Sequence, residues 1–294
     1  MTLTVGFIGF GEAGHAIAKG LASEGVATRA YDILMDGPKG RAVMEARAFD
    51  AKTLIFDSPE EMLGPCDVVI CAVFTLNCLA AAERASECLR EGQLYVDMNS
   101  VSPATKRAAQ RLVERKGARY VDAGVMAAVP PRLHKVPMLL AGSAAPDLVE
   151  RLAPYGMQME ILGPNVGQAA SAKMFQSILV KGTEALLLEC LVAASESGIE
   201  RLVLDSVTRA TPGFDWAKRA NYMLGRCAKH GSRRADEMDQ VAATLDAMGI
   251  EPMVTRGAAR RMRWAAERTG TPSRAGEAPG YQEVIAVLRA AGTA

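Results

Sequence analysis

Three glycines near the start of the sequence follow a short apolar run at the spacing Gly9-x-Gly11-x-x-Gly14. The run, residues 4–9, predicts a strand, and residues 12–23 have the small-residue pattern of a helix. Between a strand and a helix, Gly9 would allow a tight turn, Gly11 the close approach of a pyrophosphate, and Gly14 close helix–strand packing. The start of the helix would offer unpaired N–H groups and a partial positive charge to the phosphates.

An acidic residue, Asp32, ends the next strand-like segment, residues 27–32. A carboxylate at this distance from the glycine turn accepts hydrogen bonds from the adenosine ribose hydroxyls. It would also repel a 2′-phosphate, so the sequence favours NAD, while Lys39 and Arg41 nearby leave NADP open. The predicted cofactor site includes Gly9, Phe10, Gly11, Glu12, Ala13, Gly14 and Asp32.

Composition limits the classes of protein that this sequence could encode. The chain has 294 residues, is 49% hydrophobic and carries a formal charge of +1, which excludes disorder and gives no electrostatic case for nucleic acid or an anionic membrane. Six cysteines and three histidines lack metal-site spacing, so we expect no metal. Since no apolar segment reaches the ~20 residues that span a bilayer, and no leader is visible, we expect a cytoplasmic protein.

Strand-like and helix-like segments alternate up to about residue 165, and only helical patterns follow. Ser58-Pro59 and Ser102-Pro103 are typical helix starts, and residues 67–73 have the continuous apolar character of a strand buried on both faces. We therefore predict an α/β fold, a Rossmann-type doubly wound sheet over residues 1–165, followed by an all-α domain over residues 166–294. Residues 173–197 predict one long helix, and residues 270–280 a linker before a short final helix.

The sequence resembles the β-hydroxyacid dehydrogenase family, which includes 3-hydroxyisobutyrate and 6-phosphogluconate dehydrogenases. Four ordered blocks within roughly the first 200 residues carry the resemblance: residues 9–14, 97–103, 122–128 and 167–177. Residues 181–189, 222–226 and 230–234 resemble a narrower, phosphogluconate-dehydrogenase-like branch with a helical domain of unknown function. The resemblance implies a hydride transfer between nicotinamide and a hydroxy acid, with the substrate left open.

Lys173 matches the lysine that starts the long helix of the second domain in this family and acts as its general acid/base. A lysine in a cleft between domains can be desolvated, which lowers its pKa towards the working pH. The family also implies that Ser100 lies between the nicotinamide and the substrate, with Asn99 beside it. The loop after the fourth strand would contact the cofactor through Val73, Phe74, Thr75 and Asn77.

Two departures from the family pattern change the predicted substrate site. Met126, Ala127 and Ala128 replace the usual Ser-Gly-Gly, so only backbone N–H groups could bind a substrate carboxylate there. Ser177, with Gln176 beside it, replaces the usual asparagine. Val180 replaces the glutamate of 6-phosphogluconate dehydrogenase, which disfavours a decarboxylating sugar-phosphate oxidation.

The helical domain could supply replacement polar groups. His230, Arg233 and Arg234 are predicted to form a cationic cluster ahead of a helix, and Arg233 is a candidate for binding the substrate carboxylate. A solvated helix start is an equally acceptable interpretation of this cluster. For the arginines of residues 256–268 we expect a solvated or subunit-facing surface rather than a nucleic-acid site, because no platform of interleaved aromatic residues accompanies them. We expect a homodimer, because the long helix is apolar over most of its circumference. An imine reductase and a degraded nucleotide sensor remain alternative functions.

Overall fold

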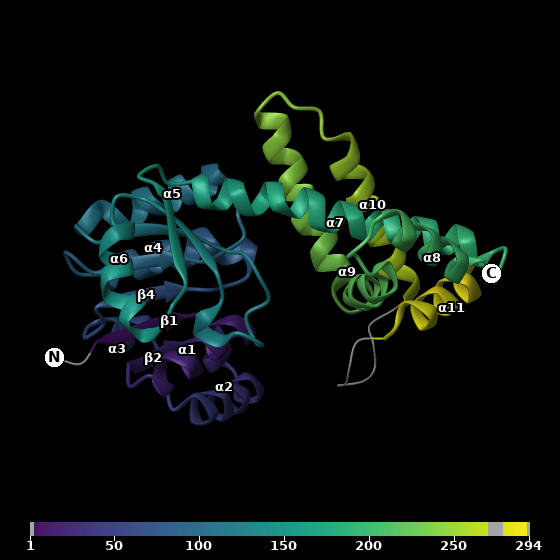
Figure 1. The fold of residues 1–294 in the computed structure, drawn as a ribbon. Coiled ribbons are helices and arrows are strands. Elements are labelled where there is room, and N and C mark those ends of the chain that lie inside the picture. Colours follow the sequence, from purple (N-terminus) through teal and green to yellow (C-terminus); the bar gives the residue numbers. More distant parts are fainter. Residues whose placement is uncertain (1–2, 270–278, 293–294) are drawn as a thin grey trace. The chain divides into compact units, whose positions relative to one another are not determined.

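The computed structural model describes residues 3–269 and 279–292. It contains two compact units, Met1–Met174 and Phe175–Ala294 (Figure 1). The first unit has two clusters of buried apolar residues, and the second unit has one of its own. The division falls inside a helix rather than near residue 165, and the assignment of residues 1–165 and 166–294 as functional domains stays a prediction. Of the predicted linker, residues 270–278 lie outside the described residues.

The first unit contains an eight-stranded sheet in the order β3-β2-β1-β4-β5-β6-β7-β8. All neighbouring strands are parallel except β6 and β7, which are antiparallel. The central strands β1 and β4 are buried along most of their length, as expected for a parallel sheet covered on both faces. The strands are β1 (Thr4–Ile8), β2 (Ala27–Tyr31), β3 (Leu54–Ile55), β4 (Val68–Cys71), β5 (Leu94–Asp97), β6 (Arg119–Val125), β7 (Met138–Ala141) and β8 (Met159–Gly163).

Helices cover both faces of this sheet, which confirms the predicted Rossmann-type fold class (Figure 1). One core lies between the sheet and α1, α2 and α6, and a second lies between the sheet and α3, α4 and α5. Ser58 and Ser102 accept hydrogen bonds from Glu61 N and Thr105 N, so both predicted caps are confirmed. The helices are α1 (Glu12–Ser23), α2 (Pro38–Ala51), α3 (Pro59–Leu63), α4 (Cys78–Cys88), α5 (Pro103–Val113) and α6 (Ala145–Leu152).

The long helix α7 (Gln168–Ser195) begins five residues earlier than its apolar pattern predicts. The reason is a distant cap: the Oδ2 atom of Asp122, on β6, accepts hydrogen bonds from Gly167 N at 2.9 Å and Ala170 N at 3.1 Å. A carboxylate at a helix start satisfies free N–H groups and favours the positive end of the helix dipole. Lys173 therefore lies in the second turn of α7 and does not start it.

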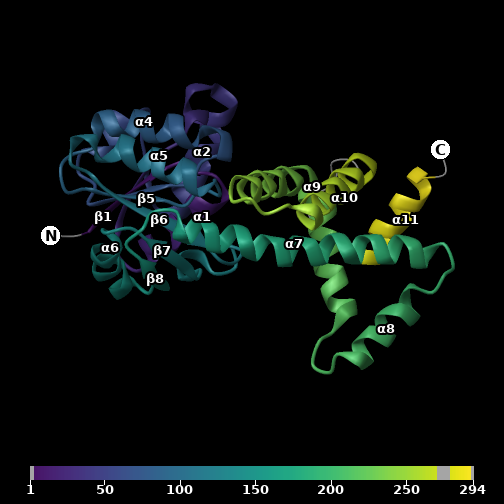
Figure 2. The ribbon, with the colours of Figure 1, turned by 90° about the horizontal axis from the view of Figure 1, so that it is seen from above.

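The described residues of the second unit form helices and connecting loops without a strand: the rest of α7 with α8 (Glu200–Ala210), α9 (Trp216–Ala247), α10 (Met253–Thr269) and α11 (Tyr281–Gly292). Figure 2 shows α9 and α10 side by side. The core of this unit includes Leu188, Leu191, Leu224 and Met262. None of the helices in the described part of the chain combines the length and apolar character that crossing a bilayer requires.

Helix α9 changes direction at His230, whose φ of −135° is not helical. The following residue, Gly231, lets α10 approach, since a Cβ there would lie 2.9 Å from the Cβ of Ala266. The predicted cationic cluster ahead of a helix is wrong in its arginines: His230 lies at the kink, whereas Arg233 and Arg234 lie inside the helical stretch after it and form ion pairs with Glu237 and Glu184. Arg234 is 3% exposed and forms a bidentate ion pair with Glu184 on α7.

Candidate functional site

The carboxyl ends of β1, β2, β4, β5 and β6 meet at one edge of the sheet, because these strands are parallel. The strand order reverses between β1 and β4, and open α/β sheets bind their ligands at such a switch point. The sequence-predicted residues of the first unit follow these ends or lie beside them. They are Gly9 after β1, Asp32 after β2, Val73 after β4, Asn99 and Ser100 after β5, and Met126 after β6.

Each of the three glycines in the turn is explained by a different feature of its surroundings. Gly9 has a φ of +87°, and a Cβ there would overlap the carbonyl oxygen of Ala72. A Cβ on Gly14 would overlap the carbonyl oxygen of Gly9, so close packing of α1 on β1 needs a glycine. Gly11 differs, because a Cβ there would meet no atom within 4 Å. The fold does not require this glycine, whereas a ligand that approaches the turn closely would.

Asp32 is 9% exposed, and its carboxylate joins the turn to β2. Its Oδ2 atom accepts a hydrogen bond from Phe10 N at 2.7 Å, and its Oδ1 atom accepts one from Leu34 N at 3.0 Å. The carboxylate thus lies beside the glycine turn, where the cofactor's ribose is predicted to bind. Asp32, the turn and the start of α1 together fit the adenosine and pyrophosphate parts of a dinucleotide.

The other predicted residues of the turn differ in exposure. The Phe10 ring is buried in the core, and only its backbone faces the turn. Glu12 is exposed in the first turn of α1, and Ala13 is partly buried.

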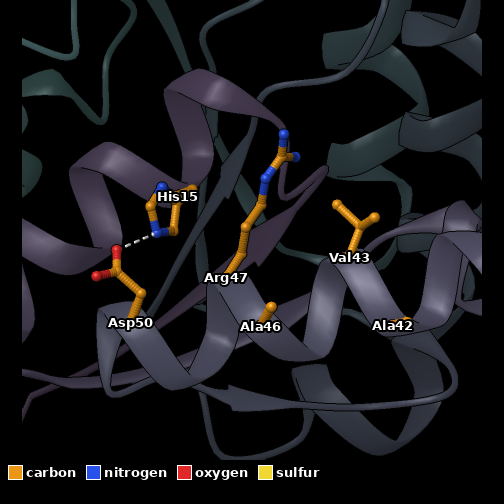
Figure 3. A pocket seen from close by; sticks show the side chains of 6 residues that line it. All are labelled: His15, Ala42, Val43, Ala46, Arg47 and Asp50. Atoms are coloured by element: carbon orange, nitrogen blue, oxygen red, sulfur yellow. Dashed lines mark hydrogen bonds and ion pairs between the residues drawn. The ribbon is translucent and has the colours of Figure 1, made fainter. Parts of the chain in front are cut away.

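A shallow pocket of about 450 Å³, wide open to solvent, lies between α1 and α2, beside the glycine turn (Figure 3). Arg47 extends from α2 and donates a hydrogen bond from Nη1 to the carbonyl oxygen of Phe10 at 3.0 Å. Asp50 accepts hydrogen bonds from His15 and Lys19, each at 2.8 Å, and the hydrogen bond from Lys19 lowers the pKa of Asp50. The sequence did not single out Arg47, because contact between a helix and a turn 37 residues away leaves no local pattern. The pocket is lined by His15, Ala42, Val43, Ala46, Arg47 and Asp50.

The loops after β4 and β5 are joined through Asn99. Its Oδ1 atom accepts a hydrogen bond from Val73 N at 2.8 Å, and its Nδ2 atom donates to Cys71 Sγ at 3.4 Å. At 5% exposure, the Asn99 side chain links two loops within the protein. Ser100 is partly buried next to it. In the loop after β4, Thr75 is partly buried, and Phe74 and Asn77 are exposed.

The loop after β6 and the start of α7 lie close together at Gly124. A Cβ on Gly124 would lie 2.8 Å from the carbonyl oxygen of Ala169 and 3.6 Å from the Cβ of Lys173. The missing side chain lets α7 pack on β6 and places partly buried Lys173 beside the strand that leads into residues 126–128. Met126 N donates to Pro137 O at 2.9 Å, and Met126 and Ala127 are partly buried while Ala128 is exposed.

A network of buried charged side chains lies beneath the loops that follow β5 and β6. Lys106, on α5, is 0% exposed and lies 3.0 Å from Asp97 Oδ1 and 3.3 Å from Asp122 Oδ1. Burial alone would raise the pKa of Asp97 and lower that of Lys106, but their mutual attraction prevails, so the pKa of Asp97 is lowered and that of Lys106 raised. Tyr120 Oη donates to Asp97 Oδ2 at 2.6 Å. Sequence reasoning missed Lys106, which looks like an ordinary surface residue in the first turn of a helix.

The remaining reactive side chains of the first unit are buried. Burial raises the pKa of the Cys71 thiol to about 12 and also raises that of Cys78, so both behave as small apolar side chains. His134 is 3% exposed, packs against Gly20 on α1, and has a pKa lowered by burial. Among residues 3–269 and 279–292, no group of three or more His, Cys, Asp and Glu side chains could hold a metal ion.

The other predicted substrate residues belong to the second unit. Gln176 is exposed and Ser177 partly buried, both on α7. The Arg233 side chain on α9 is 60% exposed and forms an ion pair with Glu237 at 3.3 Å. Three arginines of the basic helix α10 also pair with acidic residues: Arg256 with Asp246, Arg261 with Glu189, and Arg263 with Asp239. Contact of Gln176, Ser177 and Arg233 with substrate stays a prediction.

Comparison with known proteins identifies the class of this fold and site. Residues 4–155 match the family described as the NAD binding domain of 6-phosphogluconate dehydrogenase, and residues 194–265 match a domain of unknown function (DUF1932). These matches define a protein with a nicotinamide-dinucleotide-binding domain. The chain belongs to the β-hydroxyacid dehydrogenase family, in the branch that joins this NAD-binding domain to that helical domain, which confirms the resemblance seen in the sequence.

One relative without an assigned activity is more similar in sequence to this chain than two relatives named as dehydrogenases. A solved structure of a conserved hypothetical protein from Sinorhizobium meliloti 1021 is 35% identical, covers 99% of this chain and 97% of that one, and has a TM-score of 0.76. Human mitochondrial 3-hydroxyisobutyrate dehydrogenase is 24% identical over 72% of this chain and 63% of that protein. The Mycobacterium tuberculosis 3-hydroxyisobutyrate dehydrogenase structure with L-serine is 20% identical over 98% of this chain and 100% of that one, with a TM-score of 0.76, and shows that the folds agree.

Proposed function

We propose that this protein catalyses the reversible oxidation of an alcohol in a hydroxy acid, with a nicotinamide cofactor and with Lys173 as general acid/base. The observation that carries the proposal is the position of Lys173 beside Gly124, on a helix that Asp122 caps from β6. The sheet that positions the glycine turn thus also positions the Cβ of Lys173, beside the strand that leads into residues 126–128. Relatives named as 3-hydroxyisobutyrate and 2-(hydroxymethyl)glutarate dehydrogenases support the substrate class.

In the proposed reaction, each residue of the site has a separate role. A bound nicotinamide cofactor would supply the hydride acceptor for the oxidation of the alcohol carbon and the hydride donor for the reduction. Lys173 takes the proton from the substrate hydroxyl in the oxidation and gives it back in the reduction. Ser100 orients the substrate, and the N–H groups of Ala127 and Ala128 bind its carboxylate. Because Met126 offers no hydroxyl, the pocket is more apolar than in the family pattern and suits a substrate with a small apolar substituent.

Substitution of the lysine tests this assignment. Lys173→Met should lower kcat by about 10²–10⁴-fold, the usual contribution of a general acid/base, while the Kd for the cofactor stays unchanged. Lys116→Met, at an exposed position of the same unit, is the control for a new surface methionine. The assay follows NAD(P)H absorbance with panels of hydroxy acids and of imines. Retained turnover in Lys173→Met would remove this amine from the mechanism, and tight cofactor binding without turnover on either panel would favour the nucleotide sensor.

We further propose NAD rather than NADP as the cofactor. The carboxylate of Asp32 adjoins the predicted ribose position, and Arg41 is occupied by an ion pair with Asp57 at 2.7 Å. Arg47 is the cation that contacts the turn. Asp32→Asn keeps the shape of the side chain and removes its charge, so the ratio of the NADP to the NAD dissociation constant should fall at least tenfold. An unchanged ratio would contradict the assignment, and Arg47→Gln reports whether this arginine contributes to binding of the 2′-phosphate.

We also propose that the protein forms a homodimer through α7. Leu179 and Leu186 on this helix are 75% and 68% exposed, and Val180 is 38% exposed. A second copy that covered these side chains would remove apolar surface from water. The molar mass from light scattering tests the proposal, and Leu186→Glu should shift the equilibrium towards monomers. The predicted cytoplasmic location remains an expectation from the sequence.

A further inference from the structure

Three fully buried side chains connect the sheet to the elements around Lys173. Lys106 contacts Asp97 at the end of β5 and Asp122 in β6, and the side chains of all three are 0–1% exposed. Two carboxylates and one ammonium group are costly to remove from water, and replacing such groups by apolar residues is often neutral or stabilising. Stability alone therefore gives little reason for a network of this kind.

The Asp122 side of the network fixes the start of α7. Its Oδ2 atom accepts hydrogen bonds from Gly167 N and Ala170 N, while its Oδ1 atom lies against the ammonium group of Lys106. Lys173 follows Ala170 by three residues, or nearly one helical turn. Asp122 and Gly124 face the same side of β6, since side chains alternate along a strand, and Gly124 gives the second contact with α7.

The Asp97 side of the network fixes the loops that face the predicted cofactor. Asp97 Oδ1 accepts a hydrogen bond from Asn99 N at 2.8 Å, and Asn99 in turn accepts one from Val73 N. Lys106 also donates from Nζ to the carbonyl oxygen of Asp97 at 2.5 Å. One ammonium group therefore connects the helix that carries Lys173 with the loops that carry Ser100 and Val73.

We propose that Lys106 and Asp122 are positioning residues for Lys173, because their buried ion pair holds the first turn of α7 against β6 and so fixes the Lys173 amine relative to the loop of Ser100. This inference rests on the proposed function, and it explains what holds the proposed general acid/base, Lys173, in position. Reactions of this kind depend on placement, and a displacement of about 1 Å can cost about a hundredfold in rate.

The variant Asp122→Asn tests the proposal, and it leaves one buried carboxylate, Asp97, to balance the charge of Lys106. No buried charge therefore loses its last counter-ion. An asparagine cannot replace the carboxylate on both sides, because its NH₂ group must face either the ammonium group of Lys106 or the two N–H donors of α7. The first turn of α7 should loosen while the glycine turn stays intact.

Tyr120→Phe is the matched control, since it removes the hydrogen bond from Tyr120 Oη to Asp97 and leaves the cap of α7 in place. In Asp122→Asn, kcat should fall about 10–100-fold with little change in the cofactor Kd or in KM. Exchange of the Gly167 and Ala170 amides with deuterium should accelerate at least tenfold. Tyr120→Phe should lose stability without either change.

Gly124→Ala provides a second route should Asp122→Asn fail to fold. Its Cβ would press on Ala169 O, so it should also reduce kcat by moving α7, with the charge network intact. Unchanged amide exchange in Asp122→Asn, or faster exchange with unchanged kcat, would overturn the inference.

A measurement that does not depend on catalysis can distinguish failure of this inference from failure of the proposed function. Reductive ¹³C-methylation gives Lys173 an NMR signal, assigned through its loss in Lys173→Met. If no hydroxy acid is oxidised by any form of the protein, the proposed function fails, and this signal still tests the positioning. It should shift in Asp122→Asn and stay in place in Tyr120→Phe, and an unshifted signal in Asp122→Asn would overturn the inference.

Discussion

The variant Gly11→Ala adds one methyl group in the open space at the glycine turn. We expect it to weaken cofactor binding without destabilising the fold. Gly11 has φ −68° and ψ −161°, a conformation that alanine adopts without strain, and a Cβ there would meet no atom within 4 Å. Gly11→Ala should therefore raise the free energy of unfolding by about 0.4–1 kcal/mol, because alanine has fewer conformations to lose on folding. For a unit of this size the melting temperature would rise by about 1–4 °C.

The same methyl group would occupy the open space through which we predict that a pyrophosphate approaches the turn. Displacing the phosphate would cost at least one hydrogen bond to a charged group, about 1.5–3 kcal/mol, or a roughly 10- to 150-fold increase in Kd for the cofactor. Calorimetric titration with NAD and thermal unfolding of the free protein measure the two effects. Gly14→Ala is the control, because its Cβ would overlap Gly9 O and should destabilise the free protein by about 1–3 kcal/mol. A Gly11→Ala protein that binds NAD like the wild type would refute the predicted path of the pyrophosphate.

Two further predictions concern buried charge. Burial lowers the pKa of His134 in the folded protein. As the pH falls below about 6.5, the unfolded chain therefore binds a proton more readily than the folded protein does. The free energy of unfolding should fall by at most about 2 kcal/mol between pH 7 and pH 5. His134→Gln should flatten this part of the pH profile in urea unfolding, and an unchanged slope would contradict the reasoning. Glu184→Gln should cost about 3–5 kcal/mol because it leaves Arg234 buried without its anion, whereas the double variant Glu184→Leu/Arg234→Met should be near neutral or more stable. Equal losses in the single and double variants would show that the pair itself stabilises the second unit.

The fold was largely predictable because its signals are local. Buried strands such as residues 67–73 have continuous apolar runs, and the serine-proline pairs mark helix starts with a known mechanism. The antiparallel direction of β7 was not predictable, since a short apolar run looks the same in either direction. The start of α7 was placed too late because its cap, Asp122, comes from a strand 45 residues earlier.

The position of Gly9, Asp32 and Ser100 after strand ends was predictable, because the family pattern and the strand pattern coincide there, while their binding roles stay predictions. The support of the site was not predictable, because Lys106 is buried only through the fold, and a lysine in a first helical turn normally lies in water. The cationic cluster was misread for the same reason. Arg234 has the sequence context of a solvated residue, yet helix packing encloses it with Glu184.

The cap that Asp122 provides has a consequence for how such a protein can change over generations. The attachment point of the long helix is encoded in a β-strand, so the orientation of its first turns does not depend on what the chain does after Met174. Later helices could be lengthened, kinked or exchanged while Lys173 keeps its place beside β6.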